Sequence, residues 1–285
     1  MPLPKISAPS YELVIPSSKR KIKFRPFLVK EEKLLILAME SQDTKQIAKR
    51  IIDSIEILSL PFNNILEIGI NDNEILSFLK KKHVNSSITR SDISNAKFEN
   101  YTFDKYKIMD LDNWDFKKET FDMIYSNFFI HLSNDFEKLL KNIFSSLKPN
   151  GFFIATMPGP LNLYQLKNSM IKTDIDLYGG AYQRFNHNIA VEEILNKLKK
   201  ENFSIPVIDV DKIYVEYSSF QNLLKDIRVM KLGNIYKNKK NNFEKKKYFK
   251  KVEKNYSDDY LINGSFPVEI EILIVSGWKS KNKVD

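Results

Sequence analysis

The sequence contains no cysteine, which excludes disulfide bonds, thiolate nucleophiles and cysteine-ligated zinc. Histidine is scarce, and His83, His131 and His187 are too widely separated to offer metal-ligand spacing. No uninterrupted apolar run reaches the length of about 18 residues that would span a bilayer. Residues 1–5 also lack the basic-then-apolar profile of a secretory signal. We therefore expect a cytoplasmic protein with no membrane span and no metal.

Basic charge, in contrast, is abundant and concentrated. The formal net charge is +9, and residues 237–254 alone hold nine lysines against two glutamates. We interpret about 235–256 as a basic helical insertion with a solvated face, and binding of RNA or an acidic partner is the less favoured alternative. The aromatic residues Phe243, Tyr248 and Phe249 are expected to dock this segment onto the core rather than stack on bases.

The first 45 residues differ in pattern from the rest of the 285-residue chain. Residues 11–15 and 21–25 have the character of short strands on either side of a turn, which predicts a β-hairpin. Residues 29–39 place apolar side chains at helical spacing. Because a hairpin and one helix are too small to be stable alone, we predict a small hairpin-helix segment over 1–45 that packs on something else.

From residue 46 onward, strand and helix patterns alternate. The predicted strands are 64–69, 87–92, 106–110, 121–127, 152–157, 207–210, 213–217 and 268–275, and the predicted helices are 47–58, 74–81, 136–147, about 161–172 and about 190–201. Such alternation indicates an α/β fold. We predict one domain over 46–285, with a Rossmann-like, doubly wound, mostly parallel sheet and an antiparallel edge strand.

Several polar residues follow the predicted strands, where a doubly wound sheet binds its ligands. Asp92 ends the second strand, where its carboxylate can accept both ribose hydroxyls of an adenosine; capping of the next helix is an equally weighted alternative. Asp110 ends the third strand and can accept a hydrogen bond from an adenine amino group. His131 is a weak candidate for a general base, with a role in the pocket wall or as a helix cap favoured. Arg184 can receive an acidic substrate group.

Segments of this domain resemble class I methyltransferases of the type 11 group, which use S-adenosylmethionine (SAM). The resemblance rests on residues 109–116, 119–127, His131 and 147–154. Further segments resemble the methyltransferase-like family of the mitochondrial complex I assembly factor and, more distantly, the malonyl carrier-protein methyltransferases of biotin synthesis; they are 163–166, 179–180, 209–212, 223–230, 233–234 and 277–279. The resemblance covers about 46–280 and implies SAM as cofactor and a protein or small-molecule acceptor. It leaves methylation and hydroxylation both open, because the mitochondrial member is described as hydroxylating an arginine.

The same resemblance implies a set of cofactor-binding residues. They are Glu67, Gly69, Asn71, Asp92, Asp110, Leu111 and Asn127. The first loop departs from the family pattern Asp/Glu-x-Gly-x-Gly-x-Gly, because Asn71 and Asn73 replace the later glycines. Asparagine is the least costly non-glycine residue at positive φ, so the turn can still form. Its side chain and Asp72 would nevertheless crowd and repel the cofactor carboxylate, which leaves a catalytically degenerate scaffold as an alternative.

Residues 1–46 resemble a different family, the baseplate hub assembly protein of T4-like phages. The matching segments are 1–6, 11–14, 16–33 and 38–46. The chain thus looks like a fusion of a phage-like start with a methyltransferase-like domain. This resemblance implies phage baseplate proteins as partners, a virion-associated location if the segment is functional, and baseplate assembly as an alternative function.

Overall fold

The computed structural model describes residues 11–14, 21–24, 42–70, 73–93, 104–185, 188–229, 244 and 246–280. The chain divides into two compact units, Met1–Glu40 and Ser41–Asp285. In the first unit, β1 (Tyr11–Val14) and β2 (Lys21–Phe24) pair antiparallel, so the predicted hairpin is confirmed. The helix predicted at 29–39 lies outside the described residues.

The described part of the second unit is built on a seven-stranded sheet with the order β5-β4-β3-β6-β7-β9-β8. Its strands are β3 (Asn64–Ile68), β4 (Ser87–Asp92), β5 (Lys105–Ile108), β6 (Phe121–Asn127), β7 (Leu147–Pro158), β8 (Ser204–Tyr217) and β9 (Phe266–Trp278). The first five are parallel, and β9 lies between β7 and β8, antiparallel to both. This confirms the predicted Rossmann-like, mostly parallel sheet, although the antiparallel strand β9 is not at the edge, because β8 pairs on its outer side. Strand order reverses between β3 and β6, the place where such sheets bind ligands.

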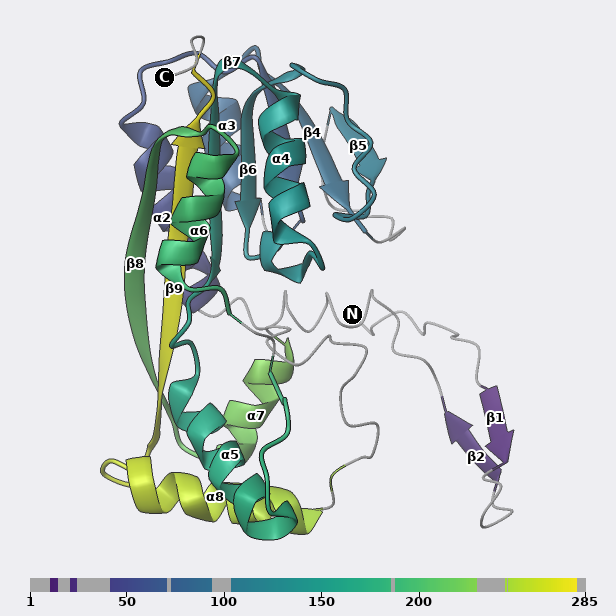
Figure 1. Ribbon diagram of the computed structural model, residues 1–285, viewed down its shortest axis with the longest axis vertical. Coiled ribbons are helices and arrows are strands. Elements are labelled where there is room, and N and C mark those ends of the chain that lie inside the picture. The colour runs from purple at the N-terminus through teal and green to yellow at the C-terminus, as the bar shows by residue number, and fades with distance from the viewer. Residues whose placement is uncertain are drawn as a thin grey trace, which may run out of the picture. The chain divides into compact units, whose positions relative to one another are not determined.

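Helices cover both faces of the sheet (Figure 1). On one face lie α2 (Gln42–Glu56) and α3 (Glu74–Lys82), and on the other lie α4 (Phe136–Ser146) and α6 (Val191–Lys200). The short 3-10 helix η1 (Ile130–Leu132) follows β6 directly. The central strands are mostly apolar, as expected of strands that helices cover on both faces.

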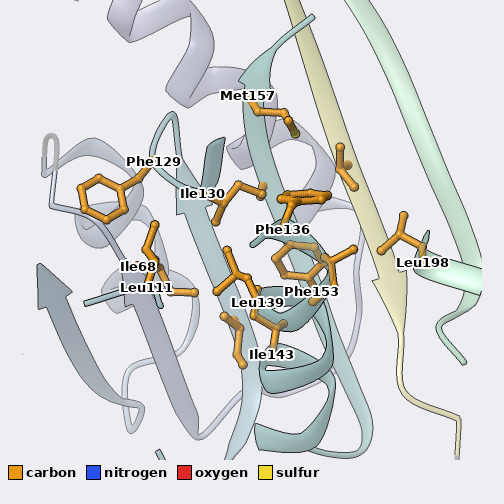
Figure 2. Packing of buried hydrophobic residues seen from close by; sticks show 14 of the residues in the cluster. Ile68, Leu111, Phe129, Ile130, Phe136, Leu139, Ile143, Phe153, Met157 and Leu198 are labelled. Carbon is orange, nitrogen blue, oxygen red and sulfur yellow. The ribbon is translucent and has the colours of Figure 1, made fainter. Parts of the chain in front are cut away.

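Figure 2 shows the packing on the face covered by α4. Phe136, Leu139 and Ile143 follow the i, i+3, i+7 spacing of one helical stripe and pack in the same cluster as Phe153 of β7. The helix begins after Asp135, whose side chain accepts a hydrogen bond from the Lys138 backbone at 2.9 Å. This cap satisfies one of the backbone N–H groups left open at a helix start. The stripe and the cap together fix α4 against the sheet.

A second group of helices lies around the far end of the long antiparallel pair β8–β9, as Figure 1 shows. These are α5 (Tyr164–Tyr178), α7 (Phe220–Val229) and α8 (Lys246–Tyr260). Tyr248 is buried in their shared cluster and Phe249 packs against it, so the predicted docking of the basic segment is confirmed for these two rings. Phe243 lies outside the described residues. The two strands predicted at 207–210 and 213–217 form one strand, because β9 offers a continuous partner along it.

Candidate functional site

The predicted cofactor residues come together along one edge of the sheet. Because β3, β4, β5 and β6 are parallel, their carboxyl ends lie side by side. The Gly69 backbone N–H donates to the carbonyl of Ser91 at 2.8 Å, and the Met109 N–H donates to that of Asp92 at 2.9 Å. The turns that follow β3 and β5 are therefore each fastened to β4.

The turn after β3 requires glycine at position 69. Gly69 has φ +79°, a left-handed conformation that costs glycine little. A Cβ atom at this position would lie 2.1 Å from Cγ of Phe129, which follows β6. Figure 2 shows the Phe129 ring near Ile68, the last residue of β3. Asn71, predicted in the same loop, lies outside the described residues.

A buried ion pair fixes the end of β3. Arg90 of β4 is fully buried, and its guanidinium holds Glu67 through two hydrogen bonds, Nε to Oε2 and Nη2 to Oε1, the second at 3.1 Å. Its Nη1 donates to Oδ1 of Asn73 at 2.9 Å. Asn73 stands where the family pattern has glycine. Its φ is −104°, so the backbone at this position is not left-handed and does not require glycine. Arg90 thus ties together β3, β4 and the start of α3.

Sequence reasoning missed Arg90. The signal was present, because an arginine inside a strand covered on both faces has to find an acidic partner. Glu67, on the adjacent strand, is the residue directly opposite in the register. The resemblance had assigned Glu67 to the cofactor, and the structure places its carboxylate against Arg90. That cofactor assignment stays a prediction.

Asp92 ends β4 as a buried carboxylate. The residue is only 4% exposed, and its Oδ2 accepts a hydrogen bond from the Ile70 backbone N–H at 3.2 Å. Burial, together with the nearby charge of Asp92, raises the pKa of Tyr106 on β5. The carboxylate therefore lies between the Gly69 turn and β5. A carboxylate in this position can accept hydrogen bonds from hydroxyl groups such as those of a ribose.

Asp110 and Leu111 follow β5 and differ sharply in environment. Asp110 is exposed, and its Oδ1 accepts a hydrogen bond from the Asp112 backbone at 3.0 Å, which stabilises its own turn. Leu111 is buried in the same cluster as Ile68 and Phe129 (Figure 2). Asp110 therefore presents a polar group next to the apolar surface to which Leu111 belongs.

Asn127 ends β6 and is held from the neighbouring strand. Its Oδ1 accepts a hydrogen bond from the Thr156 hydroxyl at 2.7 Å, and Thr156 Oγ1 accepts one from the Phe128 backbone at 3.0 Å. Phe128 has φ +52°, which is costly for a residue with a side chain. These bonds hold that conformation and direct the chain into η1, where His131 lies.

His131 lines a small cavity next to the ends of β6 and β7. The cavity has a volume of about 10 Å³ and is lined by His131, Pro158, Asn162, Leu163, Lys167, Phe185 and Asn188. Within the described part of the chain, both ring nitrogens of His131 and Oδ1 of Asn162 are buried without a hydrogen-bond partner. Burial lowers the pKa of His131 to about 4, so the imidazole is neutral at pH 7. Asn162 and Lys167 were not predicted, because no sequence pattern places them beside His131.

Arg184 lies between α5 and α6 in the chain and has a different role from the predicted one. Its Nε donates to Oδ2 of the fully buried Asp174 at 2.7 Å, and Nη2 donates to Oε1 of Glu244 at 2.9 Å. The guanidinium carbon also lies 4.3 Å from the ring centroid of Tyr248. Arg184 therefore joins α5 to α8. The interpretation that it receives a substrate carboxylate is not supported, because these acidic residues already engage it.

Comparison with known proteins identifies the fold's family. A family model described as a methyltransferase domain matches residues 39–187. The chain belongs to this methyltransferase family. By family it is an enzyme of the SAM-dependent methyltransferase class, with SAM as its cofactor.

Two relatives illustrate the range of this family. The mitochondrial arginine-hydroxylase NDUFAF5 of Danio rerio is 26% identical over 242 residues, covering 82% of this chain and 74% of that protein. The malonyl-[acyl-carrier protein] O-methyltransferase 1 of Coxiella burnetii is 21% identical over 229 residues, covering 80% of this chain and 78% of that protein. The methyltransferase resemblance seen in the sequence is thus confirmed, whereas the phage resemblance of residues 1–46 has no support from these matches.

Solved structures share the fold at low sequence identity. The YcgJ protein of Bacillus subtilis superposes with a TM-score of 0.55 at 10% identity, covering 84% of this chain and 100% of that chain. The phosphoethanolamine N-methyltransferase 2 of Haemonchus contortus, solved with S-adenosylhomocysteine, gives 0.51 at 16% identity, covering 92% and 62%. These likenesses support the fold alone.

Two features are absent from the part of the chain that the structure describes. No group of three or more histidine, aspartate or glutamate side chains there is arranged to hold a metal ion. None of its helices combines the length and the apolar character needed to cross a bilayer. The location of the protein in the cell is not decided by either observation.

Proposed function

We propose that this chain transfers a methyl group from SAM to a protein or small-molecule acceptor that approaches the sheet edge near His131. The observation that carries the proposal is the arrangement of two polar sites along one sheet edge. Asp92 and the Gly69 turn lie at the ends of β4 and β3, and the His131 cavity lies near the ends of β6 and β7. SAM, when bound, supplies an already activated methyl group, so the chain has mainly to hold and orient two partners.

The residues on the β3–β5 side fit the parts of SAM. Asp92 would accept the ribose hydroxyls, and its existing bond to the Ile70 N–H links that position to the loop that would face the methionine end. Leu111 would form an apolar wall for the adenine, with Asp110 beside it to accept from the amino group. Glu67 would act through Arg90 by holding the loop in place.

The cavity on the β6–β7 side is lined by polar side chains and has room for about one water molecule. A buried polar atom that lacks a partner costs about 1–3 kcal/mol, and three such atoms belong to His131 and Asn162, two of the residues that line this space. Asn127 ends β6, the strand between the proposed donor and acceptor sides.

Methyl transfer is proposed over hydroxylation because the family model is a methyltransferase model. The relative from Danio rerio is named an arginine-hydroxylase, so the alternative reaction has one specific observation in its favour. Mass spectrometry of an acceptor treated with protein and SAM separates the two, since a methyl group adds about 14 Da and a hydroxyl group about 16 Da.

Titration calorimetry of the full chain with SAM and S-adenosylhomocysteine tests the proposal. We expect both to bind, and Asp92→Asn to weaken SAM binding at least about tenfold because a charge-assisted hydrogen bond is lost. Asp209→Asn, an exposed aspartate on β8, is the matched control and should bind SAM normally. If millimolar SAM gives no heat with the unmodified chain, the enzymatic proposal fails and the degenerate-scaffold alternative takes its place.

The cellular location and the partner proteins are proposed separately from the reaction. A cytoplasmic location rests on the lack of a membrane-length apolar run and of a secretory signal in the sequence, and baseplate proteins as partners rest on the resemblance of residues 1–46. The division of the chain at Glu40 supports treating that segment as a unit of its own. Fractionation of cells tests the location, and co-purification from infected cells tests the partners. If the tagged chain is recovered without any baseplate protein, the proposed partnership is wrong.

A further inference from the structure

Asn73, the residue before α3, does not cap its own helix. Asparagine is strongly preferred at this position because its side-chain oxygen accepts from the N–H groups of the first turn. Here the side chain makes no capping bond, and its Oδ1 accepts instead from Nη1 of Arg90 at 2.9 Å. The Asn73 backbone, with φ −104° and ψ 3°, also lacks the extended conformation usual for a capping residue. The amide is therefore used for a bond across to β4.

Arg90 draws the Asn73 amide toward the layer between the sheet and α3. Side chains alternate along a strand, so Arg90 faces the same side of the sheet as Ile88, and Glu67 faces the same side as Ile65. Both isoleucines pack in one cluster with buried residues of α3. Arg90 is fully buried on this side and is fixed by its bonds to Glu67. The guanidinium thus holds the amide from a position that is itself fixed.

A helix start without a side-chain cap can receive an anion. The first N–H groups of a helix have no partner within the helix, and the helix dipole favours negative charge beside them. In α3 the N–H of Ser77 donates to the Asn73 carbonyl at 2.8 Å. The N–H groups of Ile75 and Leu76 precede that bond, and they are the ones that a capping asparagine would engage. In the proposed function this helix start follows the loop that faces the methionine end of SAM, which carries a carboxylate.

The residue at position 73 therefore affects whether those N–H groups are available. Glycine, which the family pattern has here, brings no side chain that could bond to them. An asparagine brings an amide oxygen that competes with the carboxylate for the same donors. The bond from Arg90 removes this competition, because it engages the amide oxygen elsewhere.

We propose that Arg90 is a positioning residue for the cofactor, which holds the Asn73 side chain off the start of α3 and leaves the first N–H groups of that helix to the carboxylate of SAM. The inference rests on the proposed function and deepens it. Neither residue has to touch the reacting atoms, so neither is a catalytic residue. Glu67 contributes by orienting the guanidinium so that its Nη1 reaches Asn73.

Titration calorimetry of the full chain with SAM tests the inference through the sign of one substitution. In the unmodified chain, Asn73→Gly should weaken SAM binding about twofold, because the loop loses its bond to Arg90. Arg90→Lys keeps a positive charge beside Glu67 and loses the planar fork that reaches Asn73. In that variant the freed asparagine can cap α3, and SAM binding should be about fivefold weaker than in the unmodified chain. Adding Asn73→Gly to Arg90→Lys should then strengthen binding and recover most of the loss.

A purely structural role for Arg90 gives a different result. Asn73→Gly would then weaken SAM binding in both backgrounds, and that outcome overturns the proposal. The pair Glu67→Gln and Arg90→Met provides a second background in which no buried carboxylate is left without a guanidinium. The same reversal of sign is expected there, so the test does not depend on the stability of one variant.

Amide hydrogen exchange of the chain without ligand reports on the side chain of Asn73 directly. In Arg90→Lys, exchange at the N–H of Ile75 or Leu76 should slow about fivefold relative to Leu79 of the same helix, because the freed amide caps the first turn. Adding Asn73→Gly should restore the faster exchange. Unchanged relative exchange in Arg90→Lys overturns the proposal.

A matched control separates this inference from the function on which it rests. Asn263 is exposed and has φ +49°, so Asn263→Gly is tolerated and should leave SAM affinity and exchange in α3 unchanged in every background. If SAM binds and the effect of Asn73→Gly keeps its sign, the positioning role is wrong and the methyltransferase proposal stands. If the unmodified chain binds no SAM, the methyltransferase proposal fails, and the role of Arg90 toward the cofactor falls with it whatever the exchange data show.

Discussion

At the scale of single residues, charge buried inside the sheet decides how the cofactor loop is held. Arg90 is fully buried and donates to both Glu67 and Asn73. Such a pair is weak evidence for added stability, because desolvation offsets much of the attraction. Removing one partner is different, since it leaves the other charge buried and uncompensated. The pair therefore acts as a constraint on the strand ends of β3 and β4.

Arg90→Met should lower the free energy of unfolding by about 3 kcal/mol, because the buried Glu67 carboxylate loses the Arg90 guanidinium. Urea denaturation measures the change. Arg50→Met is the matched control: Arg50 is 52% exposed in its pair with Asp211, so its loss should cost under about 1 kcal/mol. Adding Glu67→Gln to Arg90→Met should recover part of the loss. Equal losses in Arg90→Met and Arg50→Met would show that burial gives the pair no special weight.

His131 makes stability depend on pH in a definite direction. Burial lowers its pKa from 6.5 to about 4, so the unfolded chain binds a proton more readily than the folded one. The folded state is therefore favoured above pH 6.5 and loses that advantage as the pH falls toward 4. The shift corresponds to about 3 kcal/mol at most. Unfolding of the unmodified chain and of His131→Phe, measured between pH 7 and pH 4, should diverge by up to this amount, about 3 kcal/mol. Parallel pH profiles would contradict the burial of the ring nitrogens.

At the scale of elements, local sequence patterns located most helices and strands but missed α7 and did not fix the ends of the others. The helix predicted at about 161–172 forms as α5 from Tyr164 to Tyr178, starting late because Leu163 is left-handed. The helix predicted at 136–147 ends at Ser146, and β7 begins at once with Leu147. Pairing with neighbouring strands extended β7 and β8 beyond their apolar runs. Ends of this kind depend on the partner strand, which the local pattern does not contain.

The packing of α4 gives a prediction at this scale. Leu139 is fully buried among the residues of Figure 2, so Leu139→Ala should lower the free energy of unfolding by about 2–5 kcal/mol through the cavity it leaves. Lys141→Ala, two residues further along the exposed side of the same helix, should change it by under about 0.5 kcal/mol. Chemical denaturation measures both. A loss below about 1 kcal/mol for Leu139→Ala would mean that the helix is not packed in the core as described.

At the scale of the whole molecule, parallel pairing gathers residues from distant parts of the sequence at one edge. Asp92 is far from Asn127 and His131 in the chain, yet they lie at the carboxyl ends of β4 and β6, the two strands that pair with β3. Their approximate placement was predictable, because any doubly wound sheet presents the residues after its strands along the same edge. The second group of helices, around the antiparallel pair β8–β9, then supplies Leu163 and Lys167 to the cavity.

The sequence by itself determined the α/β class, the family, and the strand ends that carry Gly69, Asp92 and Asn127. These properties follow from periodicity and local motifs, which depend only on residues close together in the sequence. Only the tertiary structure decided that Arg90 holds Glu67, that Arg184 joins α5 to α8, and that Asn162 and Lys167 face the space beside His131. Such pairings depend on strand order and register, and no local pattern in the chain fixes which distant side chains those bring together.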